Sequence, residues 1–482
     1  MVFPVVGGNE SKGYDISNSL RFDRGDSPYL NRTPSSAGNR QTWTTSFWIK
    51  RTSLGTSQHI FSTYTGTASI NTQCDFRTDN TFQFYDSPGT GSYNWYYLTN
   101  RVFRDVSAWY HFVLAVDTTQ SSASDRVKIY VNGVQETSFS SSTNPSENDN
   151  TADWNNNSEH RIGRHSSNYL DGYLTEFHNV DGSQLLPTSF GKFDTNGVWI
   201  PKKYTGTYGN NGFFLQFKQT GTSQNSSGIG ADTSGEDNHF AVTNLAATDI
   251  TEDTCTNNFA TFNPLFVSRF DNDGTFLEGN CQRDFTDNAN RGYGMSTIGV
   301  TSGKWYWEIK VIGSDVSRIG IGVGYDGLSA FTSPFYDNNP SLGMHFYSSA
   351  SVSANGSTQS YGSAASANDI FMYALDMDNH LIWLGVNGSW FNSATVTEIQ
   401  NSTATNDITT KLSSQTFLNS GEPVFPMVND LSTTGASQFQ INFGNPPFSI
   451  SSGNTDGKYG NFEYAPPSGY YALCTKRLAE FG

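Results

Sequence analysis

The chain has 482 residues, of which 14% are aromatic and only 15% are charged. So many aromatic rings exclude a disordered chain, and the length excludes a single small module held together by disulfides. The net charge of −16 argues against a general role in binding nucleic-acid phosphates.

Apolar side chains recur with a period of two in the first half of the chain. Residues 43–51 (WTTSFWIKR) place apolar side chains on one face, which predicts a strand. Residues 109–117 are apolar at both alternating positions, as in a central strand of a two-layer sandwich. Residues 127–131 run into Asn132-Gly133, a strong signal for a tight hairpin. Further strands are predicted at 160–163, 172–177 and 212–217.

The composition changes after residue 218 to Ser, Thr, Asn, Asp and Gly, with little apolar periodicity until about residue 265. We interpret residues 219–265 as an extended connector. A few apolar side chains could pin it to a neighbouring surface, so an ordered and a disordered connector both remain open. These side chains are Phe240, Val242, Leu245 and Phe259.

A second β-rich region follows the connector. Residues 305–311 alternate large apolar with polar side chains, which predicts a strand with one buried and one solvent-exposed face. A second Val-Asn-Gly sequence, at Asn387-Gly388, predicts a hairpin like the first. The short spacings and turn residues favour antiparallel sandwiches over βαβ units. Other strands are predicted at 318–324, 342–347, 370–376, 381–386, 424–428 and 439–443.

These patterns predict an all-β protein with two antiparallel jelly-roll-type β-sandwich domains in tandem, joined by the extended connector. The expected parts are a first sandwich at 1–218, the connector at 219–265, a second sandwich at 266–450 and a C-terminal tail at 451–482. No stretch approaches ~18 consecutive apolar residues and the start does not resemble a signal peptide, so we expect neither membrane insertion nor export. Four cysteines without paired spacing predict neither a zinc site nor a disulfide framework.

Several sequence blocks resemble known families. Residues 15–217 resemble a laminin-G or concanavalin-A-like lectin domain through blocks such as TWTTSFWIK, WYHFVLAVD, VKIYVNGV and RIGRHSSNYLDGYLTEFHNVDG. Residues 266–448 resemble a SPRY domain through SGKWYWEIKV, RIGIGVGYDG, NDIFMYALDMDNHLIWLGVNGSWF and EPVFPMVND. The order of these blocks, with an LCTKRL tail, is similar to structural proteins of tailed bacteriophages, especially phages of marine bacteria.

The resemblance implies a non-enzymatic virion protein that is made in the host cytoplasm and released by lysis. Its expected role is a tail fibre or receptor-binding appendage that adheres to a host-surface glycan or protein. Other virion proteins are expected partners, and a homo-oligomer, a trimer by analogy, is the expected assembly. Two alternatives stay open: a head decoration, capsid fibre or knob protein, and a polysaccharide-degrading glycosidase.

The glycosidase alternative can be examined in the sequence. Glucanases on lectin-like sandwiches carry Glu-x-Asp-x-x-Glu on one strand, so that alternation points the carboxylates into one cleft. Only Glu147-Asn148-Asp149 begins such a run here, and Ala152 stands at the position of the acid. The segment also reads as a loop. We therefore expect no catalytic residues.

Exposed rings beside Asn, Asp or Gly groups are the residue types that grip sugars. The second half offers a comparable loop, SPFYDNN, at a position like those with which SPRY domains bind peptides. The basic residues near 161–164 are expected to be a solvated rim. The candidate ligand-binding residues are Tyr93, Trp95, Tyr96, Trp154, Phe335, Tyr336 and Asp337.

Calcium is the metal to consider, because many lectin-like sandwiches hold it at a sheet rim with loop carboxylates. The candidate ligands are Glu147, Asp149 and Asp153. An ordinary acidic loop explains the same residues in so acidic a chain. No cofactor is required by the sequence.

Overall fold

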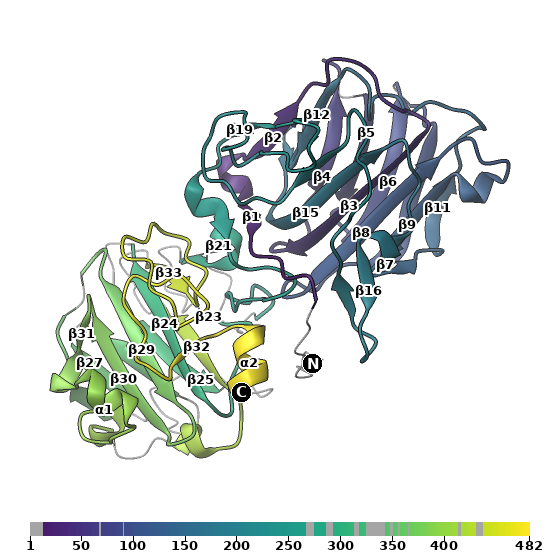
Figure 1. The fold of residues 1–482 in the computed structure, drawn as a ribbon. Coiled ribbons are helices and arrows are strands. Elements are labelled where there is room, and N and C mark those ends of the chain that lie inside the picture. The colour runs from purple at the N-terminus through teal and green to yellow at the C-terminus, as the bar shows by residue number, and fades with distance from the viewer. Residues whose placement is uncertain are drawn as a thin grey trace. The chain divides into compact units, whose positions relative to one another are not determined.

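The computed structural model divides the chain into two compact units, an N-terminal unit of residues 10–256 and a C-terminal unit that contains residues 257–482. Nearly all regular structure in both is β, which confirms the all-β prediction (Figure 1). Each unit is treated by itself. The structure describes residues 13–66, 69–89, 91–266, 274–285, 293–312, 318–323, 343–347, 350–354, 357–364, 366–412, 416–429 and 437–482.

The N-terminal unit is a sandwich of two antiparallel sheets. The first, here called the β3 sheet, has the order β10-β9-β8-β3-β15-β1-β20, with β18 also paired to β15. Its strands are β1 (Ser19–Phe22), β3 (Thr42–Arg51), β8 (Trp109–Asp117), β9 (Val127–Val131), β10 (Val134–Gln135), β15 (Gly172–Asp181), β18 (Phe213–Leu215) and β20 (Ile250–Thr251).

The second sheet, here called the β5 sheet, has the order β11-β7-β6-β5-β4-β12-β2-β19. Its strands are β2 (Tyr29–Arg32), β4 (Gln58–Tyr64), β5 (Ile70–Phe76), β6 (Thr81–Pro88), β7 (Trp95–Val102), β11 (Phe139–Thr143), β12 (Glu159–Ile162) and β19 (Ala241–Thr243). Two small hairpins accompany the sandwich: β13 (Arg164–His165) with β14 (Asn168–Tyr169), and β16 (Gly191–Phe193) with β17 (Trp199–Pro201).

The aromatic residues of both sheets meet in one core. The ring of Phe47 on β3 stacks on Phe112 of β8, with centroids 5.7 Å apart, and on Phe177 of β15 at 5.3 Å. Phe82 of β6 stacks on the same Phe112 at 4.5 Å, which joins the two sheets. Because each fully buried large apolar side chain contributes about 1.5–3 kcal/mol, this core accounts for the stability of a unit with few charges.

Both predicted Asn-Gly hairpins are confirmed by the backbone. Asn132 and Gly133 have φ values of 49° and 79°, and Asn387 and Gly388 have 47° and 83°. Positive φ at both central residues is the conformation that matches the right-handed twist of the flanking strands. The first hairpin joins β9 to β10, and the second joins β30 (Leu381–Val386) to β31 (Ser389–Trp390) in the C-terminal unit.

Residues 219–256 of the expected connector are ordered and belong to the N-terminal unit. Strand β19 pairs with β2, and β20 pairs with β1, so this segment extends both sheets. Phe240 and Leu245 are buried in the sandwich core. The buried ammonium of Lys50 on β3 forms an ion pair with the buried carboxylate of Asp253. The unit therefore extends well past residue 218.

The C-terminal unit is also built from two mainly antiparallel sheets. One has the order β21-β22-β33-β24-β29-β30-β31, with β34 paired in parallel to β24, and the other β23-β32-β25-β26-β27-β28. The strands of the first are β21 (Thr275–Leu277), β22 (Gln282–Asp284), β24 (Lys304–Val311), β29 (Ile370–Asp376), β30 (Leu381–Val386), β31 (Ser389–Trp390), β33 (Gln438–Asn442) and β34 (Tyr471–Ala472). Those of the second are β23 (Tyr293–Met295), β25 (Arg318–Val323), β26 (Gly343–Tyr347), β27 (Ser351–Ala354), β28 (Ser357–Ser360) and β32 (Val424–Asn429).

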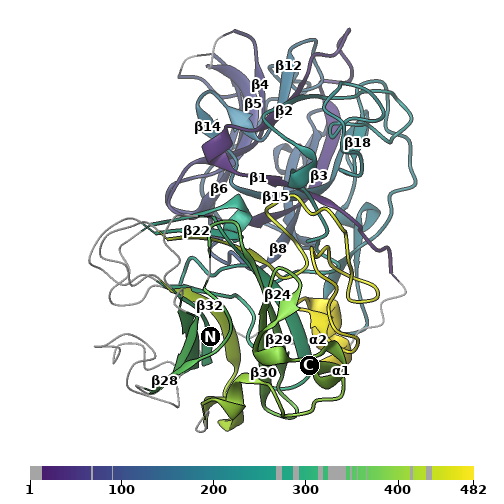
Figure 2. The same cartoon turned by 90° about the vertical axis from the view of Figure 1, so that its left-hand side faces the viewer.

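The C-terminal tail packs on the first of these sheets, and Figure 2 shows α2 (Thr475–Phe481) near β24 and β29. The carboxylate of buried Glu308 accepts hydrogen bonds from the backbone N–H groups of Glu463, at 3.1 Å, and Tyr464, at 2.7 Å. Phe462 and Tyr470 join a second apolar cluster on this sheet. Residues 451–482 are thus part of the C-terminal unit.

The helices are short. They are α1 (Val396–Gln400), α2, and 3-10 turns at Arg24–Asp26, Ala123–Asp125, Pro187–Ser189, Ala247–Asp249, Glu278–Asn280, Phe391–Ser393, Ile408–Thr410 and Thr416–Asn419. Across the described ranges, none has the length and apolarity to span a bilayer.

Candidate functional site

The outer face of the β5 sheet carries a continuous row of polar and tyrosine side chains. The apolar residues next to them along the strands, such as Phe61, Cys74 and Phe84, lie in the core, so alternation turns the row away from it. Neighbouring strands lie about 4.8 Å apart, so six strands give a row roughly 24 Å long. The row, called here the polar row, is Tyr96 (β7), Tyr85 (β6), Gln73 (β5), Ser62 (β4), Arg161 (β12) and Asn31 (β2), paired in that order.

Polar atoms on this face are buried without hydrogen-bond partners among the residues that the structure describes. They are Gln73 Oε1, His59 Nδ1, Arg77 Nε and Arg161 Nε. Leaving a buried polar group unpaired costs about 1–3 kcal/mol, and folded proteins rarely tolerate it. Buried polar atoms without a partner among the described residues also occur in the cores, at the indole nitrogens of Trp43 and Trp307, so these four atoms do not by themselves mark a site.

Asp75, the next-to-last residue of β5, adds a buried carboxyl to the same face. It pairs with His59 across the strands, and Gln73 donates a long hydrogen bond of 3.4 Å to it. Burial raises the pKa of Asp75 to about 7, although the nearby Arg77 and the hydrogen bond from Gln73 act in the opposite direction. This carboxyl is therefore poorly solvated and has spare capacity to accept hydrogen bonds.

Three tyrosines, called here the tyrosine cluster, gather at one end of the polar row. The ring of Tyr93 lies 5.3 Å from Tyr85 and 5.0 Å from Tyr96, and its residue is 52% exposed. Arg77 donates to Gln83 at 2.8 Å beside them. Exposed rings beside amide and carboxyl groups form the kind of surface on which a sugar ring can stack.

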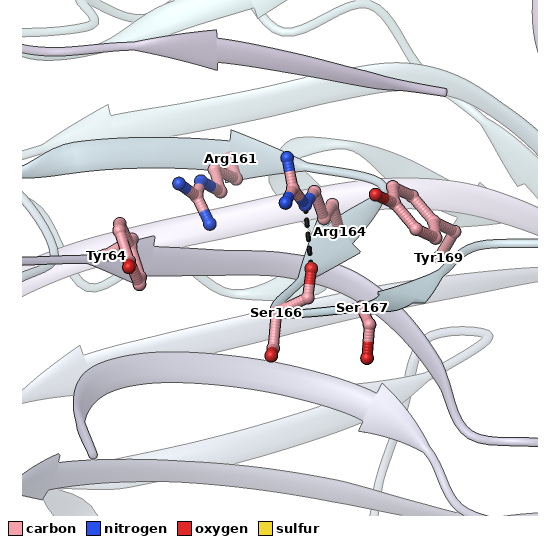
Figure 3. Close-up of a pocket in the computed structure, with 6 residues that line it drawn as sticks. All are labelled: Tyr64, Arg161, Arg164, Ser166, Ser167 and Tyr169. Atoms are coloured by element: carbon pink, nitrogen blue, oxygen red, sulfur yellow. Dashed lines mark hydrogen bonds between the residues drawn. The ribbon is translucent and has the colours of Figure 1, made fainter. Parts of the chain in front are cut away.

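A concave site of about 340 Å³, called here the arginine pocket, lies toward the other end. Figure 3 shows two guanidinium groups between two tyrosine rings, with two serines below. The guanidinium of Arg161 lies 4.0 Å from the ring of Tyr64, and that of Arg164 lies 5.3 Å from the ring of Tyr169. The lining residues are Tyr64, Arg161, Arg164, Ser166, Ser167 and Tyr169.

The structure separates the predicted ligand residues of the first half into two groups. Tyr93 and Tyr96 lie together at the surface, in the tyrosine cluster. Trp95 and Trp154 are fully buried in the core, so their expected role as exposed sugar platforms is wrong. Trp154 packs 4.4 Å from Phe61, and its indole N–H donates to Asn179 at 3.0 Å.

The predicted residues of the second half are Phe335, Tyr336 and Asp337. They lie outside the described residues.

The three predicted calcium ligands do not come together. Glu147 lies 3.4 Å from the guanidinium of Arg126, Asp149 accepts from the backbone N–H of Ser146, and Asp153 is buried. No metal-binding cluster of His, Cys, Asp and Glu occurs among the described residues. The expectation that these three carboxylates form one site is therefore wrong, because each has a different local environment.

The polar face holds two carboxylates, Asp75 and Glu159, but they are far apart. Asp75 pairs with His59 of β4, and Glu159 pairs with Tyr64 of the same strand. Five residues along a strand and two strands across place them roughly 15–20 Å apart. The two carboxyls of a glycosidase lie about 5–10 Å apart, so this pair does not fit that chemistry.

Most of this face lies outside the strands and site residues predicted from the sequence. Strands β4 to β7 were not predicted, and Tyr64, Gln73, Asp75 and Tyr169 were not considered. The available signal was the alternation in INTQCDF, where Thr72, Cys74 and Phe76 face the core.

Comparison with protein families matches residues 24–183 to the concanavalin A-like lectin/glucanases superfamily, through its Laminin_G_3 model. No curated protein matches the sequence. Among solved structures, the chain is similar to the SPRY domain of human HERC1, with 17% identity and a TM-score of 0.25, covering 37% of this chain and 96% of that one. It is also similar to domains LG4-5 of the mouse laminin alpha1 chain, with 11% identity and a TM-score of 0.28, covering 87% of this chain and 84% of that one. A third similar structure is a SAP-like pentraxin from Limulus polyphemus, with 16% identity and a TM-score of 0.25, covering 36% of this chain and 80% of that one.

Proposed function

We propose that this chain is an adhesion protein whose N-terminal unit binds a host-surface glycan along the polar row of the β5 sheet. The observation that carries the proposal is an exposed tyrosine cluster at the end of a continuous row of polar side chains on the outer face of the β5 sheet. The amide, hydroxyl and guanidinium groups of the row can exchange hydrogen bonds with sugar hydroxyls, and the tyrosine rings cover the apolar face of the sugar. The lectin-superfamily match of residues 24–183 supports the same function.

The residues of this face support glycan binding without hydrolysis. Asp75 and Glu159 are too far apart to act on one glycosidic bond, whereas the row consists of two tyrosines, two amides, one serine and one arginine. A row of roughly 24 Å offers contacts to several sugar units, each weak by itself. Several copies on one particle would multiply such contacts by avidity.

The proposed setting is a virion appendage, a tail fibre or receptor-binding protein, with other virion proteins as partners and a homo-oligomer as the assembly. This rests on the resemblance of the block order to phage structural proteins. A head decoration or fibre protein is the second candidate, favoured by the same resemblance. Immunogold labelling of particles that carry this chain tests both: label on the tail supports the first, label on the head supports the second, and unlabelled particles refute a virion role.

The binding function is tested with a glycan array and the full chain. Tyr93→Ala should weaken binding about tenfold, because a ring contact contributes on the order of 1 kcal/mol. Phe193→Ala is a matched control, since Phe193 is also 52% exposed but lies on β16, away from the β5 sheet. If both variants bind glycan as tightly as the wild type, or if both lose the same amount of affinity, the proposed face is wrong. If the purified protein shortens the glycan, the non-enzymatic function is wrong.

A further inference from the structure

The geometry points to a subsite for an anionic sugar substituent: we propose that the arginine pocket binds a carboxylate or sulfate ester of the glycan. The inference rests on the proposed function and makes it more specific. It follows from the two guanidinium groups that line a concave site at the end of the polar row away from the tyrosine cluster (Figure 3).

Arg164 has donors to spare in this pocket. Its Nε donates to the backbone carbonyl of Ser166 at 2.8 Å, and its guanidinium lies 4.6 Å from the ring of Tyr29 and 5.3 Å from that of Tyr169. These contacts fix the plane of the group. Within the described residues no acceptor or acidic partner is found for its two terminal nitrogens.

Arg161 is held in a different way and also keeps unused donors. One terminal nitrogen donates to Glu159 at 2.8 Å, and the guanidinium stacks 4.0 Å from the ring of Tyr64. Its other terminal nitrogen has no acceptor among the described residues and, unlike the buried Nε, is accessible to solvent. Glu159 is itself anchored, because it accepts from the amide of Asn31 at 3.0 Å. The ion pair therefore orients Arg161 without using all its donors.

The charges favour an anion over a neutral group. The six lining residues include two arginines and no acid, and the neighbouring Glu159 pairs with Arg161. The chain as a whole carries −16, so this positive site runs against the overall charge of the protein. Two cations close together repel each other, and an anion between them removes that repulsion. The planar fork of donors on arginine matches the oxygens of a carboxylate or sulfate.

The serines complete the subsite. Ser166 adopts a positive φ of 53°, which places its carbonyl toward Arg164 in the tight turn between β13 and β14. The hydroxyls of Ser166 and Ser167 lie at the edge of the pocket (Figure 3). A hydroxyl can donate to an anion or accept from a neighbouring sugar hydroxyl. The pocket therefore offers both charge and hydrogen-bonding capacity to an acidic sugar.

The test compares binding of the full chain to paired oligosaccharides by calorimetry. One pair is an oligogalacturonate and its carboxyl-reduced form, and the other is a sulfated galactan oligosaccharide and its desulfated form. We expect at least one anionic member to bind about tenfold or more tighter than its neutral partner, since a charged hydrogen bond is stronger than a neutral one. The pair that shows the difference identifies the anion as carboxylate or sulfate.

Arg164→Gln should remove most of that preference while leaving the near-UV circular dichroism unchanged. Arg104→Gln, an exposed arginine outside the pocket, is the charge-matched control and should keep the preference. Equal binding of anionic and neutral members overturns the anionic subsite while glycan binding itself stands. A preference that survives Arg164→Gln also overturns it.

Failure of the proposed function has a different result. If no oligosaccharide binds, the subsite is tested with inorganic sulfate alone, by the thermal stabilisation it gives the wild type relative to Arg164→Gln. Greater stabilisation of the wild type supports the anion site without glycan binding. Equal stabilisation of the wild type and Arg164→Gln, together with the lack of oligosaccharide binding, overturns both the anion site and the proposed glycan-binding function.

Discussion

Replacing Asp75 with Asn should change how stability depends on pH, because Asp75 is a carboxyl held where ionisation is unfavourable. Its pKa is raised from 3.8 to about 7 by burial. The folded state then keeps the proton over a range in which the unfolded chain has lost it. The contribution of Asp75 to the free energy of unfolding therefore falls as the pH rises from about 4 to about 7, and is constant above that.

The size of the effect follows from the shift. A difference of about 3 pH units, at about 1.4 kcal/mol per unit, is on the order of 4 kcal/mol. Asparagine has the same shape but no charge, so Asp75→Asn should match the wild type near pH 4 and exceed it by up to that amount at pH 8. The new amide can also donate to Gln73 Oε1, which has no partner among the described residues.

The assay is urea unfolding of the full chain at several pH values, with hydrogen exchange of the β5 amides to identify the N-terminal unit. Asp237→Asn is the control, because the side chain of Asp237 is 91% exposed. A difference between wild type and Asp75→Asn that stays constant from pH 4 to pH 8 would refute the reasoning. If Asp75 also accepts a sugar hydroxyl, the stabilised variant should bind glycan more weakly, which links the stability cost to function.

Other predictions concern the same unit. Asp253→Ala leaves the Lys50 ammonium buried without its partner carboxylate and should destabilise by about 3–5 kcal/mol, measured by urea unfolding; a loss below about 1 kcal/mol would mean that the pair is solvated. Trp154→Ala should lower the free energy of unfolding by about 3–5 kcal/mol, because the ring is buried, and should leave the glycan affinity of the folded protein unchanged. A loss of affinity without a loss of stability would mean that Trp154 contacts the ligand. EDTA should leave glycan binding unaltered in calorimetry, since Glu147, Asp149 and Asp153 do not form one site; calcium-dependent binding would place a metal elsewhere.

The strands with strong apolar patterns could be predicted from the sequence. Residues 109–117 and 127–131 coincide with β8 and β9, because both consist largely of β-branched and aromatic residues. Strand β5 was missed, although it alternates regularly. Its inward residues include Thr72 and Cys74, which are small, and its outward residues are the polar ones that form the candidate site.

The burial of Trp95 and Trp154, which were predicted to stack on sugars, shows a second limit of prediction from sequence. Trp95 and Trp154 lie in Asn-rich and Gly-rich segments that read as surface loops. Tertiary packing buries both, and Asn155, with a φ of 59°, directs the chain through the turn that follows Trp154. Trp154 does lie in a turn, whereas Trp95 begins strand β7, and in neither segment does local composition carry information on which ring points inward. Tyr93 and Tyr85 differ in exposure for the same reason.

The ordered segment after residue 218 closes two open edges of the sandwich. Without it, β1 and β2 would each end a sheet with free backbone N–H and C=O groups, which recruit strands from other molecules. Strands β20 and β19 occupy these positions and are themselves only two and three residues long. The chain thereby carries its own guard against edge-to-edge aggregation, and shortening it at the end of the lectin-like match would remove that guard together with the strands.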